Sequence, residues 1–253
     1  MSRPALALAG RGAIVTGAGS GIGRALAIEA ARRGMAVAIC DVDENGLGET
    51  ERLVGETGTT VTARALDITD RAALAAFAEA LRRTLPSPAL LFANAGILRQ
   101  GSILGMAADM WDRTVGINLL GAVRSLQALV PLLAEPAQVV VTGSIGSMST
   151  VPGLGAYCAT KHALWPIAET LRLELEAEGR PIGVSLLMPG AVKTAIFHQA
   201  AAGRDEPPDS IAPEEAARIA MDGALANRPF ILTHPKFVDR ARARFDAVIA
   251  AFR

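Results

Sequence analysis

The sequence predicts an α/β protein: a doubly wound, Rossmann-type parallel sheet of about seven strands with helices on both faces. Short, uninterrupted apolar runs alternate with helical patterns, as expected for strands buried on both faces. A glycine-rich turn joins the first apolar run to the first helical pattern. No linker, repeat or low-complexity segment divides the 253 residues, so we expect a single dinucleotide-binding and catalytic domain over 1–253.

Each expected strand is a short apolar run, and each expected helix carries apolar residues with a period near 3.6. The segment 195–212, with its Ala-Ala-Ala-Gly and Pro-Pro sequences, is expected to be a substrate lid loop, and 213–253 a C-terminal helix, strand and helix. In chain order the expected elements are strand Ala13–Val15, helix 21–34, strand Ala36–Cys40, helix 43–56, strand Val61–Ala65, helix 70–84, strand Leu90–Ala93, helix 107–133, strand Gln138–Thr142, helix 154–178, strand Gly183–Leu187, helix 213–227, strand Phe230–Thr233 and helix 236–252.

Composition favours a soluble, cytoplasmic protein. Hydrophobic residues make up 51% of the chain and charged residues 20%, which excludes disorder. The formal net charge is zero, so nothing indicates a nucleic-acid or membrane partner. We expect no signal peptide and no run of membrane-spanning length. Two cysteines, Cys40 and Cys158, give no disulfide framework and indicate a reducing compartment.

The glycine-rich turn is the first candidate site. It follows the Ala13–Val15 strand and opens a helix, which is the context that makes such a turn a pyrophosphate site. Glycines let the backbone approach the ligand, and the helix N-terminus offers free N–H groups. The alternative is a tight turn without a ligand. The candidate contacts are Gly17, Gly19, Ser20, Gly21, Ile22 and Gly23.

Asp41 closes the second strand and indicates which dinucleotide is bound. A carboxylate there can accept hydrogen bonds from the adenosine ribose hydroxyls and repels a 2′-phosphate. Ser20 and Val42 occupy the places where a basic residue would favour NADP. An acidic turn residue is the competing interpretation. The sequence favours NAD as the cofactor.

Tyr157 and Lys161 are one helical turn apart and would lie on the same helix face. The lysine charge would favour phenolate and lower the pKa of Tyr157 toward working pH. A phenol of that kind can exchange a proton with a carbonyl or alcohol oxygen. A tyrosine and lysine at this spacing are also common on solvated helices, so the pattern indicates this chemistry only together with other motifs.

Together with the other motifs of the chain, this pair resembles the short-chain dehydrogenase/reductases, in their compact single-domain branch. The resemblance runs from residue 12 to about 195, and it implies an NAD-linked oxidoreductase acting on alcohols or ketones. The motifs that carry it are Thr16 to Gly23, Asn94-Ala95-Gly96, Asn118, Ser144, Tyr157, Lys161 and Pro189-Gly190.

The resemblance implies roles for further residues. Ser144 would hold the substrate oxygen, whereas the nearby hydroxyl residues Thr142, Ser147 and Ser149 would have no catalytic role. The carbonyl interaction of Asn118 would anchor a proton-relay water. The implied catalytic set is Asn118, Ser144, Tyr157 and Lys161. Besides the glycine turn and Asp41, the implied cofactor contacts are Asp67, Ile68, Asn94, Ala95, Gly96, Tyr157, Lys161, Pro189, Gly190, Val192 and Thr194.

Two of these assignments have competing or qualified readings. For the Asp67-Ile68 turn, the alternative to an adenine contact is capping of the next helix by Thr69 or Asp70. Ala93 stands where the family often has asparagine, which puts one structural hydrogen bond in doubt but not catalysis.

The candidate substrate pocket is apolar and indicates a hydrophobic secondary alcohol and its ketone. Alternatives are an NADPH-dependent ketoreductase of another carbonyl substrate and a non-catalytic dinucleotide-binding sensor or scaffold. No histidine has metal-ligand spacing, so we expect no metal, although His198 could touch substrate. The candidate pocket residues are Leu98, Met148, Leu154, Ile196 and Phe197.

The helices expected at 107–133 and 154–178 carry apolar residues on more than one face. The sheet covers only one side of each, so the rest needs a partner. The resemblance implies pairing of these helices with their twofold copies, giving a homodimer or a homotetramer. Pro166, inside the second helix, predicts a bend or a helix interface that tolerates it.

Overall fold

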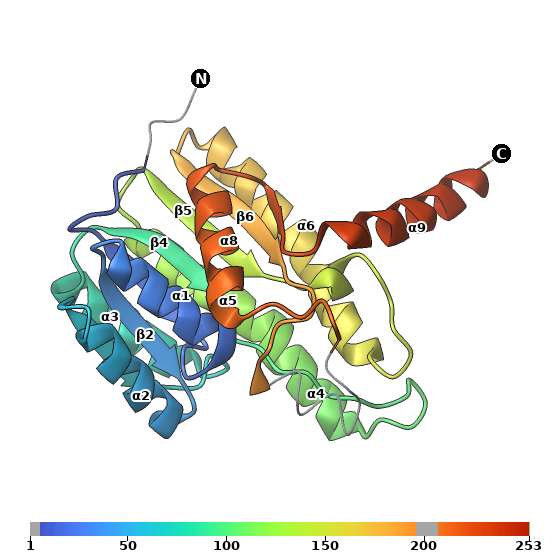
Figure 1. Cartoon of the computed structure of the whole chain (residues 1–253), viewed down its shortest axis with the longest axis horizontal. Helices are drawn as coiled ribbons and strands as arrows, with labels where there is room; N and C mark the ends of the chain where they lie inside the picture. Colours follow the sequence, from blue (N-terminus) through green and yellow to red (C-terminus); the bar gives the residue numbers. More distant parts are fainter. Residues whose placement is uncertain (1–5, 196–206, 253) are drawn as a thin grey trace.

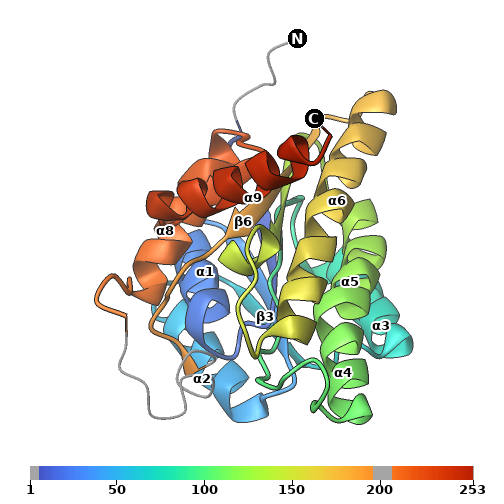
Figure 2. The same cartoon turned by 90° about the vertical axis from the view of Figure 1, so that its right-hand side faces the viewer.

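The computed structural model describes residues 6–195 and 207–252, and a seven-stranded parallel sheet forms its centre (Figures 1 and 2). The strands lie in the order β3-β2-β1-β4-β5-β6-β7. Strands β2 and β3 are added on one side of β1 and the later strands on the other, so the direction of strand addition switches between β1 and β4. Ligands of such sheets bind outside the carboxyl ends of the strands at this switch point. The strands are β1 (Gly12–Thr16), β2 (Ala36–Asp41), β3 (Val61–Ala65), β4 (Pro88–Ala93), β5 (Ala137–Thr142), β6 (Ile182–Met188) and β7 (Phe230–Leu232).

Helices cover both faces of the sheet (Figure 1). On one face α1, α2 and α8 pack on the strands through a buried cluster that includes Leu26, Leu47 and Met221. On the other, α3, α5 and α6 pack through a second cluster. The helices are α1 (Gly21–Arg32), α2 (Glu44–Gly55), α3 (Arg71–Thr84), α4 (Ala108–Val115), α5 (Ala122–Leu129), α6 (Gly155–Ala177), α8 (Pro213–Leu225) and α9 (Val238–Ala250).

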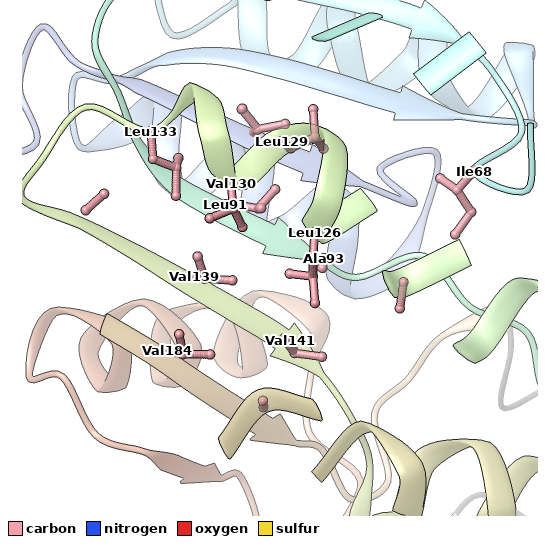
Figure 3. Packing of buried hydrophobic residues seen from close by; sticks show 14 of the residues in the cluster. Ile68, Leu91, Ala93, Leu126, Leu129, Val130, Leu133, Val139, Val141 and Val184 are labelled. Carbon is pink, nitrogen blue, oxygen red and sulfur yellow. The ribbon is translucent and has the colours of Figure 1, made fainter. Parts of the chain in front are cut away.

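The second cluster fixes the helices that carry the candidate catalytic residues. Figure 3 shows Leu126, Leu129 and Val130 of the α5 region lying over β4 and β5, where Leu91 and Val139 point toward them. Leu91, Leu129 and Val139 are fully buried. Burying side chains of this size stabilises each by about 1.5–3 kcal/mol, so the helix is held firmly against the sheet.

The doubly wound fold predicted from the sequence is confirmed, with element ends shifted by a few residues. The helix expected at 107–133 differs in kind. It runs as α4, then a π-helical segment Gly116–Gly121, then α5 and a 3₁₀ turn. The side chain of Ile68 occupies the space beside Gly121, where a Cβ would lie 2.6 Å from the Ile68 Cδ1. Helix α6 continues through Pro166 to Ala177.

One helical stretch is more apolar than we expected. The stretch Ala108–Leu132 has 25 residues and a mean hydropathy of 1.4 in its most apolar window, which reaches membrane-spanning length. Our expectation that no run does so was wrong. In the structure 39% of that window is buried, and the helix packs against the sheet. Core helices of soluble proteins share these properties.

Helix α9 leaves the body of the molecule, as Figure 1 shows at the C-terminal end of the described chain. Its Phe245 ring meets Trp165 edge-on, with centroids 6.5 Å apart. Farther along, Val248 and Ile249 are each 53% exposed and Phe252 is 87% exposed. The apolar side that the sequence predicts for this helix is therefore largely uncovered in the single chain.

Candidate active site

The glycine turn between β1 and α1 needs glycines for steric reasons. Gly17 has a φ of +68°, and a Cβ there would lie 2.5 Å from the Ala95 Cα. At Gly23 a Cβ would lie 1.9 Å from the Gly17 carbonyl oxygen. Gly21 has a φ of +52° and opens α1, with Ser20 as the residue before it. Since side chains are excluded, the backbone surface of the turn stays open to a ligand.

Asn94 holds this turn against the end of β4. Its amide donates to the carbonyl oxygens of Thr16 (3.3 Å) and Gly17 (3.2 Å). The Thr16 hydroxyl accepts from the backbone N–H groups of Asn94 and Ala95. At Gly96 a Cβ would lie 3.2 Å from the Asn118 Oδ1 and 3.3 Å from the Lys161 Nζ. The Asn94–Gly96 segment therefore joins the glycine turn to the candidate catalytic residues.

Asp41 lies at the carboxyl end of β2 with its carboxylate against the glycine turn. One oxygen accepts from the Gly19 N–H at 2.8 Å and the other from the Asp43 N–H at 3.0 Å. The side chain is half-buried, and Val42 beside it is 66% exposed. Each carboxylate oxygen keeps a further lone pair for a ribose hydroxyl. This is the position that the sequence predicts for an NAD-type adenosine site.

Sequence analysis overlooked Arg24, which also contacts the glycine turn. Its guanidinium donates to the Gly19 carbonyl at 2.5 Å, the Gly46 carbonyl at 3.1 Å and the Thr50 hydroxyl at 3.0 Å. The Thr50 hydroxyl donates in turn to the Ala18 carbonyl at 2.7 Å. Because its guanidinium is hydrogen-bonded to these internal acceptors, Arg24 stabilises the glycine turn. Its position directly after Gly23 was the available signal.

The Asp67-Ile68 turn keeps both of its interpretations. Asp70 caps α3 by accepting from Ala72 and Ala73, so the capping alternative is confirmed for Asp70. Asp67 is exposed, and its carboxylate accepts from the Thr69 N–H. Ile68 is only 6% exposed and packs into the core. A role for either residue in holding adenine stays a prediction.

Ser144 follows β5 and is 8% exposed. Its hydroxyl accepts from the Gly146 N–H at 3.0 Å, while its own N–H donates to the Ser147 hydroxyl. The Ser149 hydroxyl donates to the Ile145 carbonyl. Ser147 and Ser149 therefore have structural partners within this loop, as expected for residues without a catalytic role. Ser144 is the one of the three that borders Gly146 together with Tyr157, and its hydroxyl lowers the pKa of that phenol.

The pKa of Tyr157 is raised in this structure, contrary to our expectation of a lowered value. Burial of the phenol is the main cause, and the hydrogen bond with Ser144 opposes it. Lys161 is 4% exposed, and its ammonium donates to the Thr142 carbonyl at 2.8 Å. Burial lowers the pKa of Lys161 to about 8. The ammonium lies 5.8 Å from the Tyr157 ring centre, beside the phenol but directed elsewhere.

Asn118 lies in the π-helical segment and is fully buried. Its side-chain oxygen accepts from the Ile97 N–H at 2.8 Å, and its amide donates to the Ile97 carbonyl at 2.9 Å. The amide also reaches the Thr160 hydroxyl at 3.3 Å, one residue before Lys161. The side chain thus ties the end of β4 to α6. Anchoring of a relay water stays a prediction.

The Pro189–Thr194 segment follows β6 and passes close to the glycine turn. A Cβ on Gly21 would lie 2.9 Å from the Thr194 Cγ2. Val192 pairs with Ile211, whose backbone bonds go to the Ala191 carbonyl and the Lys193 N–H. In such a bridge the N–H and C=O of Val192 itself point away from Ile211. A role for Val192 and Thr194 in holding the nicotinamide carboxamide stays a prediction.

Only part of the expected substrate pocket can be located. Leu98 and Leu154 are half-buried, and a bridge between Gly101 and Leu154 joins their loops. Met148 is 5% exposed and packs into the core, and its assignment to the pocket stays a prediction. Ile196, Phe197 and His198, with most of the expected lid at 195–212, lie outside the described residues.

The two histidines in the described ranges have ordinary partners. His162 accepts or donates through Nδ1 to the Cys158 carbonyl at 2.7 Å. His234 is buried after β7 and bonded to Thr233 and Asp209. Within residues 6–195 and 207–252 no group of three or more His, Cys, Asp or Glu side chains is arranged to hold a metal ion.

Comparison with known proteins identifies the class. The family model for short chain dehydrogenases matches residues 11–205, and the chain belongs to this family of oxidoreductases. The 1-deoxy-11-beta-hydroxypentalenate dehydrogenase of Streptomyces exfoliatus is 31% identical over 249 residues, covering 94% of this chain and 88% of that protein.

Solved structures agree. A short-chain dehydrogenase/reductase from Burkholderia phymatum in complex with NAD is 29% identical with a TM-score of 0.90, covering 97% of this chain and 96% of that one. An alcohol dehydrogenase from the archaeon Thermococcus sibiricus, complexed with 5-hydroxy-NADP, is 25% identical with a TM-score of 0.78, covering 88% of this chain and 95% of that one.

Proposed function

We propose that the protein is an NAD-dependent oxidoreductase that interconverts a hydrophobic secondary alcohol and its ketone, with Tyr157 as the general acid and base. The observation that carries the proposal is that the side chains of Ser144 and Tyr157 both border Gly146, with the buried Lys161 ammonium 5.8 Å from the Tyr157 ring centre. Two neighbouring hydroxyls can bind the same substrate oxygen.

The residues divide the work. Ser144 holds the alcohol oxygen, and Tyr157, as phenolate, takes its proton. Lys161 favours the phenolate through its charge and is placed to bind the nicotinamide ribose. NAD supplies the hydride-accepting carbon when it is bound. In ketone reduction the same tyrosine returns its proton to the carbonyl oxygen.

The cofactor end of the site fits a dinucleotide. The excluded side chains of the glycine turn leave backbone for a pyrophosphate, and the Asp41 carboxylate faces the ribose position. The complexes of similar proteins include both NAD and an NADP derivative, so the choice rests on Asp41. Arg24 is held by internal acceptors, which supports NAD because a free cation would favour a 2′-phosphate.

The apolar side chains of Leu98 and Leu154 support a hydrophobic substrate. The similar protein from Streptomyces exfoliatus is named as a dehydrogenase of a hydroxy compound, 1-deoxy-11-beta-hydroxypentalenate, which supports an alcohol as the substrate. The direct test is a panel of aryl, alicyclic and linear secondary alcohols with NAD and NADP, read by absorbance of the reduced nicotinamide. Turnover of none of them, or of polar alcohols alone, would contradict this substrate class.

We predict at least a tenfold preference for NAD over NADP in kcat/KM. A 2′-phosphate would lie against the Asp41 carboxylate, and a tenfold preference corresponds to about 1.4 kcal/mol. Asp41→Ala should narrow the gap. Asp41→Asn is the matched variant, because it removes charge while its amide oxygen can still accept from the Gly19 N–H. Equal efficiency of NADP with the unmutated protein would overturn the assignment.

We also propose a symmetric dimer through α5 and α6. A groove of about 500 Å³ lies between the outer faces of these helices, with Val123, Val130, Ile167 and Leu171 among its lining residues. Exposed apolar surface of this kind marks protein–protein contact sites, and a second copy of the same helices would cover it. The exposed apolar residues of α9 and the adjacent β7 would extend the dimer to a tetramer.

The assembly proposal predicts different effects for two variants. Leu171→Asp should yield monomers by light scattering and reduce activity, since Tyr157 and Lys161 lie on the same helix. Val248→Asp on α9 should at most convert a tetramer into an active dimer. A fully active monomer of the unmutated protein at micromolar concentration would contradict the proposal.

A further inference from the structure

His234 is a buried imidazole for which the proposed chemistry has no use. It follows β7 directly and is 6% exposed. Its Nδ1 is 2.7 Å from the Thr233 hydroxyl, and its Nε2 is 2.9 Å from the Asp209 carbonyl oxygen. Both ring nitrogens therefore have partners, and those partners belong to different segments of the chain.

The partners determine where the protons lie. The Asp209 carbonyl can only accept, so the Nε2 of His234 carries a proton. In the neutral ring Nδ1 then accepts from the Thr233 hydroxyl. The same hydroxyl oxygen accepts from the Gly190 N–H at 2.9 Å. A directed chain results: Gly190 donates to Thr233, Thr233 to His234, and His234 to Asp209.

The chain of bonds ends on the segment beside the cofactor site. Gly190 belongs to the Pro189–Thr194 segment, and its backbone packs directly on the imidazole, because a Cβ there would lie 2.5 Å from the His234 Nδ1. At the other end Asp209 precedes Ile211, whose backbone bonds to Ala191 and Lys193. His234 thus holds both sides of the segment that approaches the glycine turn through Thr194.

The charged groups that face His234 are Asp209 and Lys236. The Asp209 Oδ2 is 4.0 Å from Nε2, and Lys236 pairs with the same oxygen at 2.5 Å. Lys236 is 59% exposed in its side chain, and exposed ion pairs contribute little. The buried hydrogen bonds are the stronger constraint, because an unpaired buried donor or acceptor is costly.

We propose that Thr233 and His234 are positioning residues that fix the Pro189–Thr194 segment and so the nicotinamide end of the cofactor. They touch neither substrate nor cofactor and act through the Gly190 backbone. The inference rests on the proposed function for its cofactor. Its geometric part, the link from His234 to Gly190, holds in the free protein as well.

The first test compares Thr233→Val with Thr233→Ser by NADH fluorescence titration. Valine has a similar shape but can neither accept from Gly190 nor donate to His234, whereas serine can do both. We expect Thr233→Val to weaken NADH binding about tenfold and Thr233→Ser to restore it, since an unpaired buried group costs of that order. Lys236→Ala, which breaks only the exposed ion pair, should change the affinity less than about twofold.

The second test pairs Gly190→Ala with His234→Ala. The added methyl clashes with the imidazole, so Gly190→Ala should weaken NADH binding more in the unmutated background than in His234→Ala, where the ring is gone. Equal effects in both backgrounds would overturn the proposal. So would identical NADH affinities of the folded valine and serine variants at position 233.

Hydrogen exchange separates this inference from the cofactor assignment. In the free protein the Gly190 amide should exchange at least about tenfold faster in Thr233→Val than in Thr233→Ser, because its acceptor is lost. If the unmutated protein bound no NADH, the proposed function would fail and this exchange rate alone would decide the link. Unchanged exchange at Gly190 would overturn it.

Discussion

Tyr157→Phe is expected to abolish turnover and to leave NAD binding nearly intact. The variant keeps the ring, which lies beside Ser144 at Gly146, and loses only the hydroxyl. General acid–base catalysis contributes about 10²–10⁴-fold, so loss of the ionisable hydroxyl removes at least that factor. Steady-state kinetics with the best alcohol of the panel, together with NADH titration, would measure both quantities.

Ser149→Ala is the matched control for this variant. It also removes one hydroxyl near the site, but that hydroxyl donates to the Ile145 carbonyl. Its kcat should stay within about threefold of the unmutated value, as expected for a group outside the reaction. Substantial activity in Tyr157→Phe would show that another residue carries the proton.

The raised pKa of Tyr157 corrects the interpretation from sequence. The spacing of Tyr157 and Lys161 places the two groups on one face, but it does not report how deeply both are buried. In the free protein burial dominates the phenol, and the ammonium is directed to the Thr142 carbonyl. The pKa of Tyr157 can therefore fall only if its surroundings change so that the Lys161 charge outweighs burial. We propose that binding of NAD and substrate causes this change.

The fold could be predicted because its signals are local. The buried strands read as apolar runs, and the glycine turn lies between a strand and a helix as the chemistry requires. The four proposed catalytic residues could be chosen because their spacing resembles a known family. The structure then places the four in two pairs: Asn118 and Lys161 border Gly96, and Ser144 and Tyr157 border Gly146.

What sequence could not give depends on contacts between distant segments. The π-helical segment that carries Asn118 includes Gly121, which packs against Ile68 from more than fifty residues earlier in the chain. The commitment of Arg24 to Gly46 and Thr50 is not visible from its neighbours in sequence. The burial of Met148 in the core cluster is likewise not visible from its place in the loop.

Lys161→Met is expected to impair both NAD binding and turnover. Methionine fills a similar volume but provides neither the ribose contact nor the charge beside Tyr157. We expect NADH affinity to fall about tenfold and kcat by a further 10-fold or more, in contrast to Tyr157→Phe, where only kcat falls. Titration and kinetics on the same preparations separate these two patterns. Unchanged NADH affinity would show that Lys161 does not bind the ribose.

The same variant has a pH signature in the free protein. Burial holds the pKa of Lys161 at about 8, against an ordinary value of 10.5. Between these values the unfolded chain binds a proton that the folded protein does not, so stability rises with pH across that window. The free energy of unfolding of the unmutated protein, relative to Lys161→Met, should therefore increase from pH 8 to 10, below the range where the phenol of Tyr157 ionises. Denaturant titrations at several pH values would measure this difference in the free energy of unfolding. A difference that stays constant or falls with pH would mean that burial does not lower the pKa of Lys161.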